Sequence, residues 1–306
     1  MWHMDAIEIR GVTKTFGDLA AVDDLSLSVP EGAVYGFIGP NGSGKTTTMR
    51  MIVKIFYPDR GTIRVLGEDS RSSRRDRIGY LPEERGLYRR MEVRALLEFH
   101  GELRGGANVT AEVNQWLERL DLARWATKRV ETLSKGMSQK VQFIAAVVPE
   151  PKVLILDEPF TGLDPVSVDT IRTAILDLRR RGATVILSTH DMTVAESLCD
   201  SILMIYRGRK VLDGTLEEIQ RQYGSDTIRV SAAGGFDNLP GVEKVRDLGH
   251  VQELRMAPGC DPQEVLRALL DRTRVTGFAI ARPSLHDIFV RIAGPEAAEE
   301  REARHE

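Results

Sequence analysis

The sequence is poor in the features that mark several classes of protein. Its two cysteines, Cys199 and Cys260, have no CxxC spacing, which fits thiols in a reducing compartment better than a disulfide framework or a zinc site. The formal net charge is only −3, so electrostatics gives no case for nucleic-acid binding. No apolar run approaches the roughly 20 residues that span a bilayer, and the amino-terminal residues lack a signal-peptide pattern. Any membrane role is therefore expected to come through a partner.

The 306 residues suggest one large domain and a smaller one. Alternating and apolar segments predict strands, and helical periodicity without an intervening strand runs through about 86–134. Parallel strands connected by helices predict a βαβ arrangement, and so an α/β fold with a mixed sheet. The expected strands are 6–12, 24–30, 34–38, 62–66, 153–157, 184–188 and 202–205, and the expected helices include 45–55, 166–181 and 192–198.

The pattern changes after about residue 222. Strands are expected at 227–231, 242–246, 251–256 and 275–281, with helices at 262–272 and 285–292. We therefore predict a main domain over 5–222 and a small α+β domain over 223–293. Residues 294–306 alternate between acidic and basic and contain no aromatic residue, which predicts a disordered tail.

A glycine-rich turn lies between an expected strand and an expected helix. Its sequence fits GxxxxGK[ST], in which glycines let successive N–H groups face one anion and the helix start adds its dipole. Lys45 supplies a charge for terminal phosphates, and the hydroxyl of Thr46 suits Mg²⁺. The predicted phosphate-binding residues are Gly39, Pro40, Asn41, Gly42, Ser43, Gly44, Lys45, Thr46 and Thr47.

Two later strands end in polar residues, at the sheet edge where ligands bind in open α/β folds. Asp157 and Glu158 follow an apolar run. Asp157 is expected to hold Mg²⁺ and Glu158 to deprotonate the attacking water, although a strand ending in two acids, taken by itself, is more often a capping or solvated turn. His190 follows the next strand, where its imidazole can donate one hydrogen bond and accept another. The phosphate loop favours the catalytic interpretation of all three.

A second motif, Leu133-Ser134-Lys135-Gly136-Met137, precedes Asp157 by about two dozen residues and starts a predicted helix with Ser134 as N-cap. With this motif, residues 5–220 resemble the ATP-binding subunits of ABC transporters, whose signature sequence is LSGGQ. The resemblance implies a P-loop ATPase cassette with an antiparallel β subdomain and a helical insert. It also implies that Ser134 and Gly136 cap the γ-phosphate of ATP bound by an opposing subunit.

Other residues take roles from the same resemblance. Phe16 lies where the family has an aromatic that stacks on adenine, although a core position is equally open. Thr161-Gly162-Leu163-Asp164 resembles the loop that reaches the opposing subunit. Glu83 stands where the family has a glutamine that orients Mg²⁺ or water; a solvated loop acid is the alternative, since its charge is unfavourable near phosphates. Lys135 and Met137 also depart from the signature.

The sequence resembles one branch of the family in three features: Glu83, the Lys135 variant of the signature and the small C-terminal domain. Members of this branch serve exporters with a separate permease, including sodium and drug exporters. The resemblance implies ATP and Mg²⁺ as cofactors, ATP hydrolysis, a location on the inner face of the membrane, and a permease partner. The chain carries both halves of an ATP site, the phosphate loop and the signature motif. Two copies arranged head-to-tail would therefore complete two ATP sites, and a related cassette in place of the second copy is the alternative. The competing hypotheses are a soluble ABC-type ATPase acting on nucleic acid or ribosomes, and a non-catalytic ATP-dependent regulator.

Overall fold

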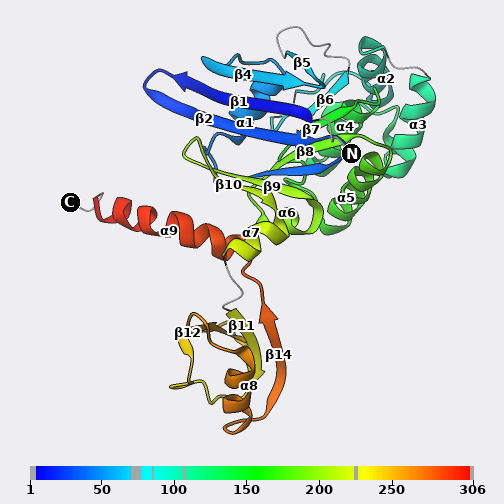
Figure 1. Cartoon of the computed structure of the whole chain (residues 1–306). Helices are drawn as coiled ribbons and strands as arrows, with labels where there is room; N and C mark the ends of the chain where they lie inside the picture. The colour runs from blue at the N-terminus through cyan, green and yellow to red at the C-terminus, as the bar shows by residue number, and fades with distance from the viewer. Residues whose placement is uncertain (1–4, 70–76, 85, 106–107, 224–226, 304–306) are drawn as a thin grey trace. The chain divides into compact units, whose positions relative to one another are not determined.

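The computed structural model describes residues 5–69, 77–84, 86–105, 108–223 and 227–303, which divide into two units at Thr215 and Leu216 (Figure 1). The boundary lies before the predicted one, because the helix after residue 215 groups with the second unit. The strands of the first unit are β1 (Asp5–Phe16), β2 (Leu19–Pro30), β3 (Val34–Ile38), β4 (Arg60–Val65), β5 (Glu68–Asp69), β6 (Ile78–Leu81), β7 (Val153–Asp157), β8 (Thr184–Thr189), β9 (Ser201–Tyr206) and β10 (Arg209–Thr215).

The central sheet of the first unit has the order β10-β9-β3-β8-β7-β6. Its strands from β9 to β6 pair in parallel, while β10 pairs antiparallel with β9. The parallel register brings strand ends together: Ile38 pairs with Thr189 and Asp157 with Ser188. The end of the phosphate-loop strand thus lies beside the ends of the strands that carry the polar residues.

A second, antiparallel sheet has the order β2-β1-β4-β5. Side chains of β3, β7 and β8 are buried throughout, as expected for parallel strands covered on both faces. Alternate residues of β7 serve two cores: Val153 and Ile155 pack with the antiparallel sheet and α1, and Leu154 and Leu156 pack with the helical segment.

The helices of the first unit are α1 (Lys45–Ile52), α2 (Val93–Leu103), α3 (Val109–Arg119), α4 (Lys135–Val147), α5 (Pro165–Arg180) and α6 (Met192–Leu198), with 3-10 helices η2 (Ala123–Trp125) and η3 (Val130–Thr132).

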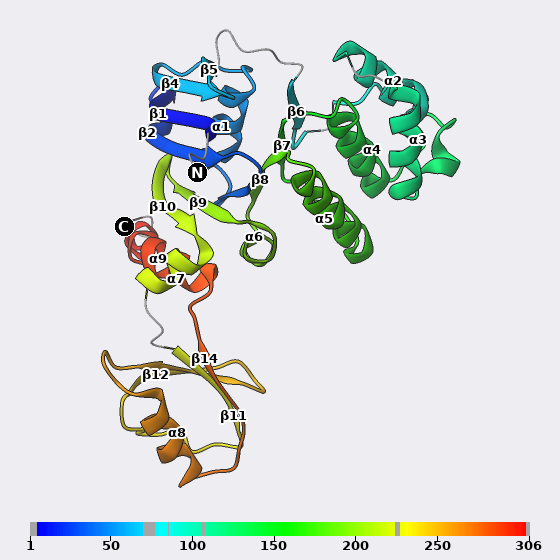
Figure 2. The ribbon, with the colours of Figure 1, turned by 45° about the vertical axis from the view of Figure 1, so that its right-hand side comes forward.

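Seen from another side, α2, α3 and α4 group beyond the β6 edge of the central sheet (Figure 2). The predicted helical stretch at 86–134 is confirmed, and the described part of it contains α2, α3, η2 and η3. Sequence patterns missed β5, β6 and β10, which are short or lie at sheet edges where one face needs no apolar residues.

The second unit contains α7 (Leu216–Gln222), β11 (Thr227–Ala232), β12 (Val242–Asp247), β13 (Gln252–Met256), α8 (Pro262–Leu270), β14 (Val275–Ala281) and α9 (Leu285–Ala303). Its antiparallel sheet has the order β12-β13-β11-β14, and one face packs against α8 through Ile228, Leu254 and Val265. The predicted α+β character is confirmed. The prediction of a disordered tail from residue 294 is wrong as far as Ala303, because α9 continues through that segment. Among the described helices, none is both long enough and apolar enough to cross a bilayer.

Candidate functional site

The phosphate loop connects β3 to α1, and its shape depends on glycine. Gly39, Gly42 and Gly44 have φ values of +147°, +78° and +109°. A Cβ on Gly39 would lie 2.2 Å from the carbonyl oxygen of Ile205, and one on Gly44 would lie 2.5 Å from that of Ala21. Backbone on both sides therefore excludes side chains here, and the loop runs directly into the first N–H groups of α1. This arrangement suits an anion.

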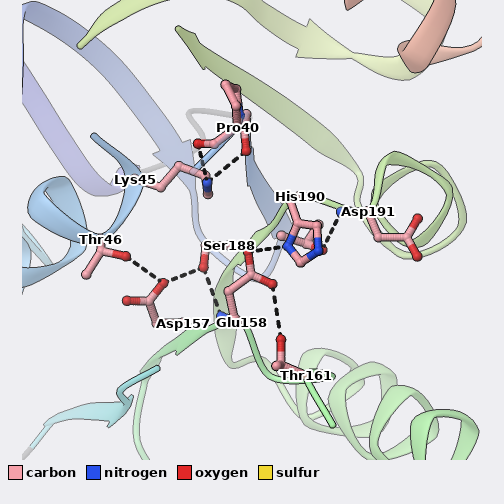
Figure 3. Close-up of polar contacts among 11 residues, drawn as sticks. Pro40, Lys45, Thr46, Asp157, Glu158, Thr161, Ser188, His190 and Asp191 are labelled. Atoms are coloured by element: carbon pink, nitrogen blue, oxygen red, sulfur yellow. Dashed lines mark hydrogen bonds and ion pairs between the residues drawn. The ribbon is translucent and has the colours of Figure 1, made fainter. Parts of the chain in front are cut away.

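Lys45 is held over that loop. Its side chain is 5% exposed, and Nζ donates hydrogen bonds to the carbonyl oxygens of Gly39 at 2.8 Å and Pro40 at 3.0 Å (Figure 3). Burial lowers the pKa of Lys45, while the charges of Glu158 and Asp157 oppose that shift. A buried ammonium held by neutral carbonyls gains most from an arriving anion, because phosphate oxygens are stronger acceptors.

Asp157 is fully buried at the end of β7. Its Oδ1 accepts hydrogen bonds from Ser188 Oγ at 2.5 Å and from Thr46 Oγ1 at 3.2 Å, whereas its buried Oδ2 has no partner in the described part of the chain. A buried carboxylate oxygen without a partner is costly unless a cation is bound. Together with the Thr46 hydroxyl it gives the hard oxygen donors that Mg²⁺ prefers, so these residues fit the ion.

Glu158 follows Asp157 and is held from three sides. Its N–H donates to Ser188 Oγ at 2.9 Å, and its carboxylate meets His190 Nδ1 at 3.0 Å and Thr161 Oγ1 at 3.5 Å (Figure 3). Its φ of +50° is a left-handed conformation that costs a non-glycine residue about 1–2 kcal/mol. The fold thus tolerates strain to keep this carboxylate 9% exposed beside the phosphate loop.

Lys45, Thr46 and Glu158 border one hollow of about 430 Å³ in the first unit. Its walls include Phe16, Glu83 and Glu158, as well as the residues from Asn41 to Thr47. Phe16 is 44% exposed, so the alternative of a core position is wrong; its ring meets Phe56 edge-on, with centroids 5.3 Å apart. Glu83 is exposed at the edge of the hollow, and its charge, like those of Glu158 and Asp157, opposes the lowering of the Lys45 pKa by burial. The hollow is large enough for a nucleotide.

Ser134 and Gly136 belong to another part of the unit. Ser134 caps α4 as predicted, because its Oγ accepts from Met137 N at 3.3 Å. Neither residue lines the hollow, so a single chain does not bring them to the phosphate loop. The side chain of Lys135 covers Gly162, where a Cβ would lie 2.7 Å from Lys135 Cε. The variant signature residue therefore packs on the loop that resembles the family's contact with the opposing subunit.

Helix α4 also touches the site through two buried amides. Gln139 Nε2 donates to the carbonyl oxygen of Pro159 at 3.2 Å, and Gln142 Nε2 donates to that of Glu84 at 3.2 Å. These bonds tie the helical segment to the loops that follow β7 and β6. Sequence reasoning gave no role to these glutamines or to Ser188; a small polar residue ending an apolar strand was the available signal for Ser188.

Comparison with known proteins agrees with this geometry. The chain is 39% identical over 293 residues to "Uncharacterized ABC transporter ATP-binding protein YhaQ" of Bacillus subtilis (strain 168), covering 94% of this chain and 98% of the relative. The chain belongs to the ATP-binding subunits of ABC transporters. The family model described as "ABC transporter" matches residues 22–161 of this subunit, and that described as "ATP-binding protein DrrA1-3-like, C-terminal domain" matches residues 214–293.

Two further relatives place the ABC subunit more closely. It is 35% identical over 300 residues to "Nod factor export ATP-binding protein I" of Burkholderia lata, covering 95% of this chain and 97% of the relative. A solved structure titled "Structure of ATP binding subunit of ABC transporter" has a TM-score of 0.68 and 30% identity, covering 72% of this chain and 93% of that one. The P-loop cassette fold is confirmed, and an ABC subunit of this type powers a separate membrane permease. The relatives do not favour the nucleic-acid or ribosome hypothesis.

Proposed function

We propose that this ABC subunit binds ATP with Mg²⁺ in the hollow beside the phosphate loop and hydrolyses it. The single observation that carries the proposal is the cluster at the sheet edge, where Asp157 accepts hydrogen bonds from Thr46 and Ser188, and the N–H of Glu158 donates to Ser188. The residues from Gly39 to Thr47 would receive the phosphates, with Lys45 neutralising the terminal groups. Phe16 offers an exposed ring for the base.

Thr46 and Asp157 would hold Mg²⁺, which would offset the charge of the β- and γ-phosphates. The partnerless Oδ2 of Asp157 supports this assignment. Glu83 lines the same hollow and is proposed as a further group that orients the ion or its water. The hydroxyl of Ser188 donates to Oδ1 of Asp157, the same carboxylate oxygen that Thr46 contacts, and so helps to fix its orientation.

Glu158 is proposed as the general base for the attacking water. His190 Nδ1 and Thr161 Oγ1 meet its two carboxylate oxygens, so the group has one preferred orientation. An ionised carboxylate only accepts hydrogen bonds, so Nδ1 carries the donated proton. The imidazole is 60% exposed toward solvent, where its second nitrogen can meet a phosphate.

A second chain is proposed to complete each ATP site. Ser134 and Gly136 lie at an exposed helix start outside the hollow, and an N-cap with free N–H groups suits an anion brought by another molecule. Two copies related head-to-tail by a two-fold axis would place each signature turn over the other's phosphate loop. A related cassette in place of the second copy is the alternative assembly.

Closure of that dimer is proposed to drive a membrane permease in the direction of export. The contacts of Gln139 and Gln142 with the loops of the site give the helical segment a route for the motion. The match to a Nod factor export subunit supports the export direction. The subunit would then lie at the inner face of the membrane, bound to its permease.

The decisive experiment replaces the proposed base, Glu158→Gln. We expect ATP affinity within about threefold of wild type and a loss of turnover of at least about 10²-fold, because general-base catalysis typically contributes 10²–10⁴-fold. Fluorescent-nucleotide binding and phosphate release are measured on the same preparation. Glu84→Gln, a neighbouring exposed acid that does not line the hollow, is the matched control. Wild-type turnover in Glu158→Gln would exclude this residue as the base.

A further inference from the structure

Strand β6 leads the chain to Glu83, one of the acids at the edge of the ATP hollow. It is the last strand of the central sheet, and among the described strands it pairs with β7. The register ends where Leu81 pairs with Leu156, so Glu83 lies two residues beyond the last strand pair. Its position at the hollow therefore depends on contacts other than strand pairing.

Helix α4 lies directly against this strand (Figure 2). A Cβ on Gly79 would lie 2.4 Å from the carbonyl oxygen of Ala146, so the strand and the helix backbone touch with no side chain between them. One turn earlier in α4, the side chain of Gln142 reaches the loop that follows β6. Its Nε2 donates a hydrogen bond to the carbonyl oxygen of Glu84 at 3.2 Å. The backbone of the residue next to Glu83 is thus held by the helical segment.

The surroundings of Gln142 do not otherwise require an amide. The side chain is buried, and its neighbours Val141, Phe143 and Ile144 are fully buried apolar residues. Its Oε1 is buried as well and has no hydrogen-bond partner in the described part of the chain. A buried acceptor without a partner destabilises a protein, and an apolar side chain of similar length would avoid that cost. Packing alone therefore does not explain the amide, whereas its bond to Glu84 does.

Helix α4 carries a second buried amide in the same arrangement. Gln139 Nε2 donates to the carbonyl oxygen of Pro159 at 3.2 Å. Residues three apart lie on one face of a helix, so the two amides are on the same side of α4. Each holds the backbone directly after an acid of the hollow: Gln139 after Glu158, and Gln142 after Glu83. The two contacts can therefore be separated by experiment, because the proposed roles of the two acids differ.

We propose that Gln142 is a positioning residue for Glu83 in the binding of Mg²⁺ with ATP. The inference rests on the proposed ATP site and deepens it. By fixing the carbonyl of Glu84, Gln142 restricts the backbone that carries the Glu83 side chain and keeps that carboxylate at the hollow. Thr46 and Asp157 would still hold the ion, so the loss of Gln142 weakens Mg²⁺ binding without abolishing it.

The test replaces the amide by an apolar side chain of similar length, Gln142→Met, in the full chain. Binding of a fluorescent ATP analogue is titrated with Mg²⁺, and the half-saturating Mg²⁺ concentration is compared with that of wild type. We expect this concentration to rise about three- to tenfold, as for the loss of one hydrogen bond, while binding in EDTA changes less than about twofold. The melting temperature should equal or exceed that of wild type, because the partnerless Oε1 is removed. Gln142→Leu repeats the measurement if the methionine variant is poorly folded.

Gln139→Met is the matched control, since it makes the same change on the same face of α4. It should lower ATP turnover while the half-saturating Mg²⁺ concentration stays within about twofold of wild type. The double variant of Gln142→Met with Glu83→Ala should show no shift beyond that of Glu83→Ala alone, because the positioned carboxylate is already absent.

Three results would overturn the inference and leave the ATP site in place. They are an unchanged Mg²⁺ concentration in Gln142→Met, an equal shift in Gln139→Met, and a shift that persists in the Glu83→Ala background. ATP binding by wild type that does not respond to Mg²⁺ would overturn the magnesium assignment and this inference together.

Discussion

Ser188 Oγ donates a 2.5 Å hydrogen bond to Asp157 Oδ1 and accepts a 2.9 Å bond from the N–H of Glu158. Ser188 and Asp157 are register partners on neighbouring parallel strands. One buried hydroxyl therefore positions the residue proposed to hold the metal ion and the backbone of the proposed base. The relationship depends on strand pairing rather than on proximity in sequence.

Ser188→Ala is expected to lower the free energy of unfolding by about 1–3 kcal/mol, because it removes a partner from a buried carboxylate and a buried N–H. We also expect weaker Mg²⁺-dependent ATP binding, since Asp157 loses its fixed orientation. Chemical denaturation and nucleotide titration measure the two effects. Ser197→Ala removes an exposed helical hydroxyl and should change stability by less than about 0.5 kcal/mol. Equal effects of the two variants would contradict the role given to Ser188.

His190→Ala is expected to reduce ATP turnover by about 10²-fold while ATP affinity changes little, because the loss of its contact misplaces the Glu158 carboxylate. Steady-state phosphate release and nucleotide binding separate these quantities. Thr161→Val removes the longer, 3.5 Å contact and should cost less. In the double variant with Glu158→Gln, the two losses of turnover should not add, because the two residues act together in the same catalytic step. Additive losses would show that His190 acts independently of Glu158.

Gly39→Ala is expected to abolish nucleotide binding or to unfold the first unit. Its Cβ would lie 2.2 Å from the backbone oxygen of Ile205, which cannot move without separating β9 from β3. Gly42→Ala is the control in the same loop: its φ is +78°, but a Cβ there meets nothing within 4 Å. Only strain of about 1–2 kcal/mol is expected for that control. Melting temperature and nucleotide affinity rank the variants, and a milder effect for Gly39→Ala would contradict the account of the loop.

Asp59 is expected to make stability depend on pH in the acid range. Hydrogen bonds from Lys14 Nζ, Thr15 N and Thr15 Oγ1 lower the pKa of Asp59 to about 2. Because the folded pKa is depressed, the stabilisation is present above the unfolded value, near pH 4, and is lost as the pH falls toward 2. Melting curves of wild type and Asp59→Asn should therefore differ at pH 6 and converge near pH 2. A constant difference across that range would refute the coupling.

The same substitution is expected to weaken ATP binding at neutral pH. Asp59 holds the end of β1, where Lys14 Nζ lies 5.4 Å from the centroid of the Phe16 ring. Release of this end would let the Phe16 ring leave the wall of the hollow, since its other contact is an edge-on one with the ring of Phe56. Phe16→Leu serves as the comparison in nucleotide titrations. An unchanged ATP affinity in both variants would remove Phe16 from the binding site.

The sequence by itself determined the nucleotide-binding elements, because their chemistry is local. The run from Gly39 to Thr46 needs glycines at fixed spacing between a strand and a helix, and β3 and α1 form where expected. Apolar runs ending in Asp157 and Ser188 likewise predicted β7 and β8, the second of which continues one residue further, to Thr189. One helix start was visible as well: Ser134 caps α4 through a bond within three residues.

Tertiary structure decided which of these pieces meet. The pairing of β7 with β8 brings Ser188 to Asp157. The pairing of β9 with β3 brings the carbonyl oxygen of Ile205 so close to Gly39 that no side chain fits there. In both cases the two residues are far apart in sequence. Register across the second sheet places Lys244 beside Arg255, a pairing with no signal in either strand alone. The continuation of α9 to Ala303 was likewise missed, because a charged, aromatic-free segment predicts disorder by composition. Local patterns fix the elements, whereas contacts between distant residues depend on packing and strand order, which no single segment encodes.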